Sequence, residues 1–221
     1  MLSGLARPAL QQLGHHLLQP AAAAAFLQMQ QAAARDGITL TIASSYRDFT
    51  TQARIWRAKL AGERPVYDNM EQLVDIQQFN ERDKLYTILH FSALPGTSRH
   101  HWGTDLDVFD SAAISEDYKL QLTPAEYAAT GPFYRAERWL HLHAKNFGFF
   151  RPYRQYNGGV AVEPWHLSYA PLAKNYLQQL TEQQVLSACQ SAQLVAFSLL
   201  KAEISEIMQR FVFNICEGID E

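Results

Sequence analysis

The sequence predicts an α+β fold, in which a small antiparallel sheet is flanked by helices and followed by a C-terminal helical extension. Two segments have the alternation and the β-branched or aromatic residues of short strands: residues 38–43, which follow the helix breaker Gly37, and residues 105–109. Residues 20–34, rich in alanine, glutamine and leucine, predict a helix before the first strand. From Pro171 the composition changes to Gln, Ala, Leu and Ser, which indicates the extension.

Further helices are expected on both sides of the second strand. Asp48 or Thr50 can cap a helix that runs to Leu60. Residues 69–89 are expected to be helical, although their apolar spacing is loose. Residues 133–147 predict a helix with a partly apolar face.

The last strands of the sheet are expected to form a hairpin. Asn157-Gly158-Gly159 is a hairpin signal between a strand that begins at Phe149 and residues 160–162. We therefore expect residues 1–170 to form one domain, with residues 171–221 packed on it as the helical extension. These helices could also pack on a partner subunit and form a homodimer.

Composition excludes several classes of protein. A hydrophobic content of 48% is sufficient for a sizeable core, and a net charge of −3 argues against a nucleic-acid partner. No apolar run approaches the roughly 20 residues of a membrane span. The N-terminus lacks a basic region followed by an apolar core, so we expect no signal peptide and a cytoplasmic location, or a periplasmic one if a leader has been removed. The two cysteines, Cys189 and Cys216, do not make a disulfide framework.

Potential metal ligands are concentrated in one short segment. His100 and His101 precede Gly103, which allows the chain to turn into the strand that carries Asp105 and Asp107. Residues two apart on a strand share a face, so both carboxylates would point the same way. A carboxylate on a buried strand is costly unless it is paired or binds a metal. Imidazole combined with carboxylate suits zinc better than calcium or copper.

The remaining parts of a catalytic metal site are found in residues 163–166. His166 can complete a set of three protein ligands and leave a position open for water. Glu163 is not required as a ligand, so it can serve as a general base. Pro164 excludes a helix interior, and a local bend is needed to bring Glu163 and His166 to the same side.

The pattern S-x-H-x-x-G-x-x-x-D followed by E-x-W-H resembles the zinc D-alanyl-D-alanine carboxypeptidases of the VanY type, relatives of the hedgehog and lysostaphin-like peptidases. The matching residues are Ser98, His100, Gly103, Asp107, Glu163, Trp165 and His166. The resemblance implies that His100, Asp107 and His166 bind zinc. It also implies that Glu163 is the catalytic base.

A second signature, S-x-Y-R-x-x-x-x-Q, resembles the same family and is formed by Ser44, Tyr46, Arg47 and Gln52. The resemblance implies that Arg47 faces the substrate and stabilises its carboxylate or the developing oxyanion. Arg47, Ser98, Gln52, Tyr46 and Trp165 are the expected substrate-binding residues. Trp165 could belong to the core or form a wall of the pocket.

Two residues of the metal segment have open roles. The family usually has a small residue at the position of Asp105, which could hold a ligand histidine or compete with Asp107 for the metal. His101 is a rival to His100 as a ligand, although we favour a structural role for it.

The resemblance implies removal of the C-terminal D-amino acid, D-alanine, from peptidoglycan-derived peptides. We favour L,D-carboxypeptidase activity on recovered muropeptides, because a cytoplasmic enzyme that trimmed D-Ala-D-Ala from nascent precursors would damage its own host. The alternatives are a D,D-carboxypeptidase or dipeptidase, and a peptidoglycan endopeptidase of the same fold. A non-catalytic zinc-binding module is disfavoured because Glu163 is present.

Overall fold

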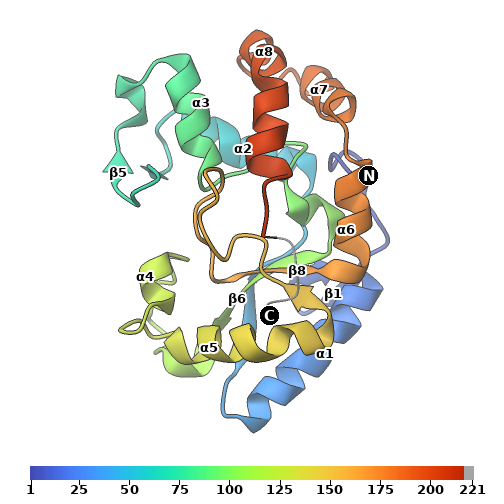
Figure 1. The fold of residues 1–221 in the computed structure, drawn as a ribbon, viewed down its shortest axis with the longest axis vertical. Coiled ribbons are helices and arrows are strands. Elements are labelled where there is room, and N and C mark those ends of the chain that lie inside the picture. The colour runs from blue at the N-terminus through green and yellow to red at the C-terminus, as the bar shows by residue number, and fades with distance from the viewer. Residues whose placement is uncertain (217–221) are drawn as a thin grey trace.

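A four-stranded antiparallel sheet lies at the centre of the protein in the computed structural model, which describes residues 1–216 (Figure 1). Its strands follow the order β3–β6–β8–β7 and span Leu40–Ser44, Asp105–Asp110, His166–Tyr169 and Phe149–Phe150. Every neighbouring pair is antiparallel. The predicted α+β class with a small antiparallel sheet is therefore confirmed.

One layer of helices packs on the sheet through a first apolar cluster. It consists of α1 (Pro20–Arg35) and α5 (Tyr134–His143), which lie below the strands in Figure 1. Leu106, Val108 and Leu167, all without solvent exposure, join this cluster from the sheet. Because side chains alternate along a strand, the opposite face of β6 presents Asp105 and Asp107.

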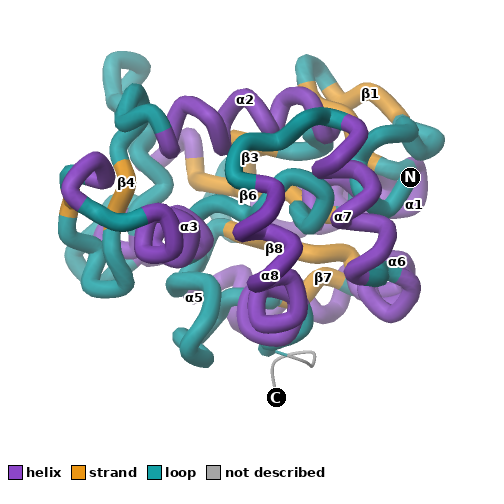
Figure 2. The backbone as a smooth tube through the Cα atoms, turned by 90° about the horizontal axis from the view of Figure 1, so that it is seen from above, coloured by secondary structure: helices purple, strands orange, loops and turns teal. Residues whose placement is uncertain are grey.

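A second layer of helices lies above the strands and has a separate apolar cluster. They are α2 (Phe49–Leu60), α3 (Glu81–Leu89), α6 (Ala170–Gln179), α7 (Glu182–Ser191) and α8 (Phe197–Ile207), followed by a π-helical turn at Met208–Val212. Figure 2 shows α8 between α3 and α7. The remaining elements are β1 (Gln11–Leu13), β2 (His16–Leu18), β4 (Val66–Tyr67), β5 (Leu73–Val74) and α4 (Pro124–Tyr127).

The C-terminal helices share their core with the helices that precede the sheet. Leu200 and Ile207 are buried in the same cluster as Trp56 of α2 and Leu89 of α3. The division into two domains and the homodimer stay predictions. Within residues 1–216, no helix combines the length and the apolar character that a membrane crossing requires.

The helix predicted over residues 69–89 is wrong in its first half. The segment begins with the β4–β5 hairpin and a single 3-10 turn, and α3 starts only at Glu81. The reason is local capping: the Asn80 side chain accepts a hydrogen bond from the backbone N–H of Asp83 and starts the helix there.

The hairpin predicted at Asn157-Gly158-Gly159 is also wrong. Residues 160–162 are not a strand, and β7 pairs with β8 instead. Gly159 serves close packing, because a Cβ atom there would meet the carbonyl oxygen of Arg210, whereas Gly158 has a left-handed φ of 88°. His90 accepts the backbone N–H of Ala161 on its carbonyl oxygen, so the loop is fastened to the helices rather than to the sheet.

Candidate active site

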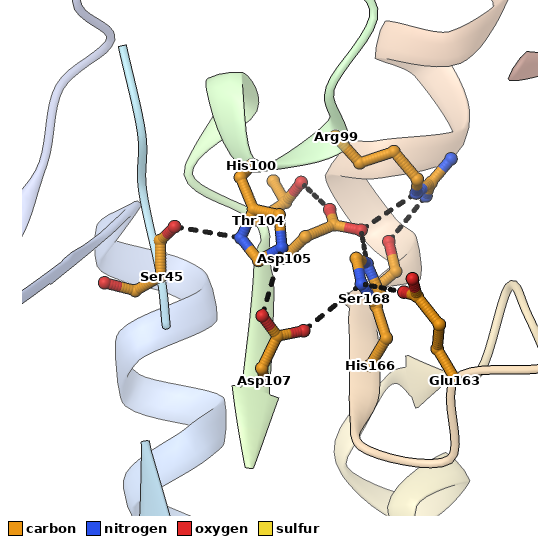
Figure 3. Close-up of polar contacts among 9 residues, drawn as sticks. All are labelled: Ser45, Arg99, His100, Thr104, Asp105, Asp107, Glu163, His166 and Ser168. Carbon is orange, nitrogen blue, oxygen red and sulfur yellow. Dashed lines mark hydrogen bonds and ion pairs between the residues drawn. The ribbon is translucent and has the colours of Figure 1, made fainter. Parts of the chain in front are cut away.

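Three predicted ligands meet on the open face of the sheet (Figure 3). One possible ligand atom from each of His100, Asp107 and His166 lies within 4.8 Å of the other two. Asp107 stands directly opposite His166 in the β6–β8 pairing, so the antiparallel register makes these two residues neighbours. His100 arrives from the 3-10 turn Arg99–Trp102, which ends at Gly103 with a φ of 70°. This left-handed conformation confirms the turn predicted at that glycine.

The hydrogen bonds of His100 fix which of its nitrogens faces the triad. Nδ1 lies 2.9 Å from the carbonyl oxygen of Ser45, and a carbonyl can only accept, so Nδ1 carries the proton. Nε2 is then the atom with a free lone pair, and it lies 3.5 Å from Oδ2 of Asp107. Burial lowers the pKa of His100 to about 3, with help from Arg47, so the ring is neutral as a metal ligand must be.

Asp105 binds the nitrogen of His166 that points away from the triad, and this contact defines the role of Asp105. Nε2 of His166 donates to Oδ1 of Asp105 at 3.0 Å, while Nδ1 points to Asp107. Asp105 is itself fixed by Arg99 Nε at 2.8 Å and by the Thr104 hydroxyl at 2.6 Å. The Arg99 guanidinium also donates to the Ser168 hydroxyl at 2.6 Å. With its oxygens occupied in this way, Asp105 orients a ligand rather than competing with Asp107.

His101 has the structural role that we favoured. Its Nδ1 donates to the carbonyl oxygen of Arg47 at 2.7 Å, and its Nε2 accepts the N–H of Gly96 at 3.1 Å. Both ring nitrogens are thus used inside the protein, and the ring has no exposure to solvent. His101 therefore joins two loops, and His100 is the histidine of this pair that reaches the candidate metal triad.

The electrostatics of the triad favour a bound cation. Burial acts to raise the pKa of Asp107, but His100, His166 and Arg47 bring it down to about 2, so the group is a carboxylate at neutral pH. Its Oδ1 is buried and accepts no hydrogen bond. Burial acts to lower the pKa of His166, yet the surrounding carboxylates raise it well above its ordinary value. Two imidazole nitrogens and one carboxylate are the donor set of a catalytic zinc site, and these residues fit it, because a bound metal would take the place of the proton on Nδ1 of His166.

Glu163 lies beside the triad because of a tight turn at residues 163–166. The backbone N–H of His166 donates to the carbonyl oxygen of Glu163, which supplies the bend that the sequence required. Oε2 of Glu163 consequently lies 3.3 Å from Nδ1 of His166. Burial raises the pKa of Glu163, and contact with His166 offsets part of that effect.

The triad opens into a cleft of about 660 Å³ that also contains Arg47. Arg47 follows β3, at the junction where Asp48 caps α2 by accepting the N–H of Thr51 at 2.7 Å. Its Nε is buried without a hydrogen-bond partner. Burial lowers the pKa of Arg47, and the charges of Asp107 and Glu163 counteract this effect. Arg47 thus presents an unsatisfied donor beside the metal ligands.

The other predicted substrate-binding residues divide into two groups. Ser98, Gln52 and Trp165 line the cleft. Gln52 donates to the carbonyl oxygen of Ala93, which leaves its own Oε1 buried and without a partner. Trp165 is both core and wall, since its ring also packs 5.6 Å from that of Tyr127. Tyr46 is not among the residues that line the cleft, so its role in binding stays a prediction.

Sequence reasoning missed several residues of the cleft, among them Tyr153, Lys59 and Arg64. The ring of Tyr153 lies 5.0 Å from that of His166, and burial raises its pKa to about 12. Its irregular segment offered no pattern that could have revealed it. For Lys59 the spacing from Gln52 on one predicted helix was a usable signal, because residues seven apart share a helix face.

The fold and this site define a metal-dependent hydrolase of the carboxypeptidase class. The family model described as "VanY: D-alanyl-D-alanine carboxypeptidase" matches residues 15–172, and the chain belongs to that family. Two uncharacterised proteins of Haemophilus influenzae are also similar. One is 32% identical over 121 residues, which cover 54% of this chain and 92% of that protein. The other is 41% identical over 99 residues, which cover 42% and 68%.

Solved structures share the fold. A zinc complex of the vancomycin resistance D,D-pentapeptidase VanY, in which one glutamate is replaced by alanine, has a TM-score of 0.54 at 23% identity and covers 82% of this chain and 90% of its own. VanYB in complex with D-alanine-D-alanine has the same score and identity over 80% and 87%. The LdcB LD-carboxypeptidase has a TM-score of 0.52 at 21% identity over 77% and 73%.

Replacing Asp105 by asparagine should weaken zinc binding by about 10- to 100-fold, because His166 loses the carboxylate that fixes its orientation and raises its basicity. Competition with a chromogenic chelator measures this affinity. Asp110→Asn is the matched control: Asp110 is buried on the same strand but accepts the backbone N–H groups of Thr39 and Ala112, away from the triad. Equal zinc affinity in Asp105→Asn and the parent protein would refute the orienting role.

Proposed function

We propose that this protein is a zinc carboxypeptidase that removes the terminal D-amino acid from peptidoglycan stem peptides. The observation that carries the proposal is the convergence of a base and a cation on one metal triad. Glu163 and Arg47 come from different parts of the chain and line the same cleft. The charge of each shifts the pKa of the other, and the charge of Asp107 shifts the pKa of both. Membership of the carboxypeptidase family supports the reaction class.

Zinc held by His100, Asp107 and His166 would supply Lewis acidity, which acidifies a water molecule and polarises a carbonyl. Glu163 accepts the proton of the attacking water and delivers it to the leaving amine. Burial makes its carboxylate more basic than usual, which suits a group that must take a proton near neutral pH. Neither cysteine lines the cleft, so the residues present support direct attack by water without a covalent intermediate.

Arg47 binds the free carboxylate at the end of the peptide. A buried guanidinium nitrogen without a partner is costly, and a substrate carboxylate satisfies it with charge-assisted hydrogen bonds. Ser98, which is 3% exposed and lines the cleft, can donate its hydroxyl to the same group or to the oxyanion. An endopeptidase has no terminal carboxylate for such an arginine to bind, so Arg47 favours the carboxypeptidase reading.

We further propose that the bond cut follows an L-centre, as in the removal of D-alanine from recovered tetrapeptides. The fold itself accommodates both specificities, because a D,D-pentapeptidase and an LD-carboxypeptidase both have it. The support is metabolic: an enzyme that worked in the cytoplasm would need to spare the D-Ala-D-Ala ends of nascent precursors. A cytoplasmic location is part of this proposal. D,D-carboxypeptidase activity is the second candidate, and the name of the family favours it.

Glu163→Gln should keep stoichiometric zinc and lose about 10²- to 10⁴-fold in kcat, because the general base is removed while the ligands stay. Zinc content by elemental analysis and hydrolysis of a tetrapeptide are the two measurements. His166→Ala provides the contrast, since it should lose the metal itself. A fully active Glu163→Gln protein would show that another group takes the proton.

Arg47→Gln should lower kcat/KM on free-acid peptides by ~2–4 kcal/mol of transition-state stabilisation, or about 30- to 1,000-fold. Amidation of the substrate C-terminus should cause a similar loss in the parent enzyme and little further loss in the variant. Arg54→Gln, on the exposed side of α2, is the control. If acid and amide peptides are cleaved equally, the endopeptidase alternative is favoured.

The choice of bond is decided by incubating the zinc enzyme separately with muropeptide tetrapeptides and pentapeptides and identifying the products by mass spectrometry. We expect release of D-alanine from the tetrapeptide. Release from the pentapeptide alone would replace the L,D proposal by the D,D candidate while leaving the zinc mechanism intact.

A further inference from the structure

One face of α2 forms a wall of the cleft. Gln52, Ile55 and Lys59 all line it, and their spacing of three and four residues places them in a row along the helix. Arg64 follows the end of the helix and lines the same cleft from an exposed position. Arg47, which follows β3, lines the cleft near the triad. The cleft therefore has three cationic lining residues in this part of the chain: Arg47, Lys59 and Arg64.

The acids of the cleft do not neutralise this wall. Asp107 and Glu163 belong to the metal site, and a divalent cation bound there would balance them. The remaining acid that lines the cleft is Glu71, which is exposed. With the metal present, the wall formed by Arg47, Lys59 and Arg64 is a positive surface inside a concave site.

Lys59 is not an ordinary solvated surface lysine. Its side chain makes no hydrogen bond or ion pair with any residue between 1 and 216, although it is only partly exposed. Burial lowers its pKa to about 8, Glu163 counteracts this effect, and Arg64 and Arg47 add to it. By contrast, Arg54 on the same helix is exposed. The attraction of an anion that enters the cleft would offset the cost of desolvating Lys59 and its repulsion by Arg64 and Arg47.

We propose that Lys59, assisted by Arg64, binds a second carboxylate of the substrate, carried on a side chain upstream of the scissile bond. The inference rests on the proposed function, in which Arg47 already binds the terminal carboxylate. The cleft of about 660 Å³ is large enough for several residues of a peptide. The enzyme thus selects stem peptides in which the diamino acid bears an additional carboxylate over those that contain lysine.

The test compares two tetrapeptides that differ only in this residue, a diamino diacid in one and lysine in the other. For zinc-loaded Lys59→Gln, KM for the diacid peptide should rise about tenfold, with little change in kcat and little change for the lysine peptide. Lys59→Arg should restore most of the preference, and the effect should diminish at high salt. Lys174→Gln, an exposed lysine of α6, is the matched control.

Equal effects of Lys59→Gln on both peptides, or no effect on either, would overturn the inference while leaving the proposed function in place. If neither peptide is cleaved by the parent enzyme, the proposed function fails instead. Calorimetric binding of both peptides to zinc-loaded Glu163→Gln, with and without Lys59→Gln, then decides the role of Lys59 independently of catalysis. Selective loss of affinity for the diacid peptide supports the inference, and unchanged affinity refutes it.

Discussion

The pairing of β6 with β8 is the constraint on which the site depends. Its register places Asp107 opposite His166 and Asp105 opposite Ser168, so two metal ligands and two members of the supporting network lie on adjacent strands. A shift of one residue would exchange the two faces of β6 and turn both carboxylates toward the apolar cluster beneath the sheet. That cluster, with Leu106 and Leu167 fully buried, therefore fixes the site as well as the fold. The packing of one face determines the chemistry of the other.

A chain of buried charges extends from this pairing. Asp105 is more acidic than usual because Arg99 and His166 outweigh the effect of its burial, and it remains charged without any exposure to solvent. Removing either partner of such a pair leaves an uncompensated charge, so Arg99 and Asp105 depend on each other. As a result, Nε2 of His166 is occupied by its hydrogen bond to Asp105. Nδ1 of His166 therefore faces Asp107 in one fixed orientation of the ring. A catalytic metal site requires ligand atoms that are preorganised in this way.

Much of this site could be predicted from the sequence, because it is encoded locally. Alternation along a strand was sufficient to place Asp105 and Asp107 on one face, and the family resemblance supplied the ligand set that the structure brings together. Capping chemistry likewise offered Asp48 and Thr50 as N-caps of α2, and Asp48 is the one that the structure uses. The predictions failed where contacts with distant parts of the chain determine the local structure. The glycines at 158 and 159 have the composition of a hairpin turn, yet the helices at the other end of the chain decide their conformation.

Those distant partners explain why the C-terminal helices belong to the site. The Arg210 side chain donates to the carbonyl oxygen of Gly158, and Asn214 donates to that of Asn157. The N–H of Cys216 donates to the carbonyl oxygen of Pro152. These contacts, at Pro152 and at residues 157–158, fix the loop that leads to Glu163. Within the loop, the backbone N–H of Glu163 donates to the carbonyl oxygen of Tyr153.

Phe211, which lines the cleft, comes from the same π-helical turn. The segment lies beyond the residues matched by the family model, yet it contributes a lining residue to the cleft. The turn after α8 therefore forms part of the cleft wall and holds the loop that carries Glu163. The C-terminal helices pack in the same apolar cluster as α2, which carries Lys59.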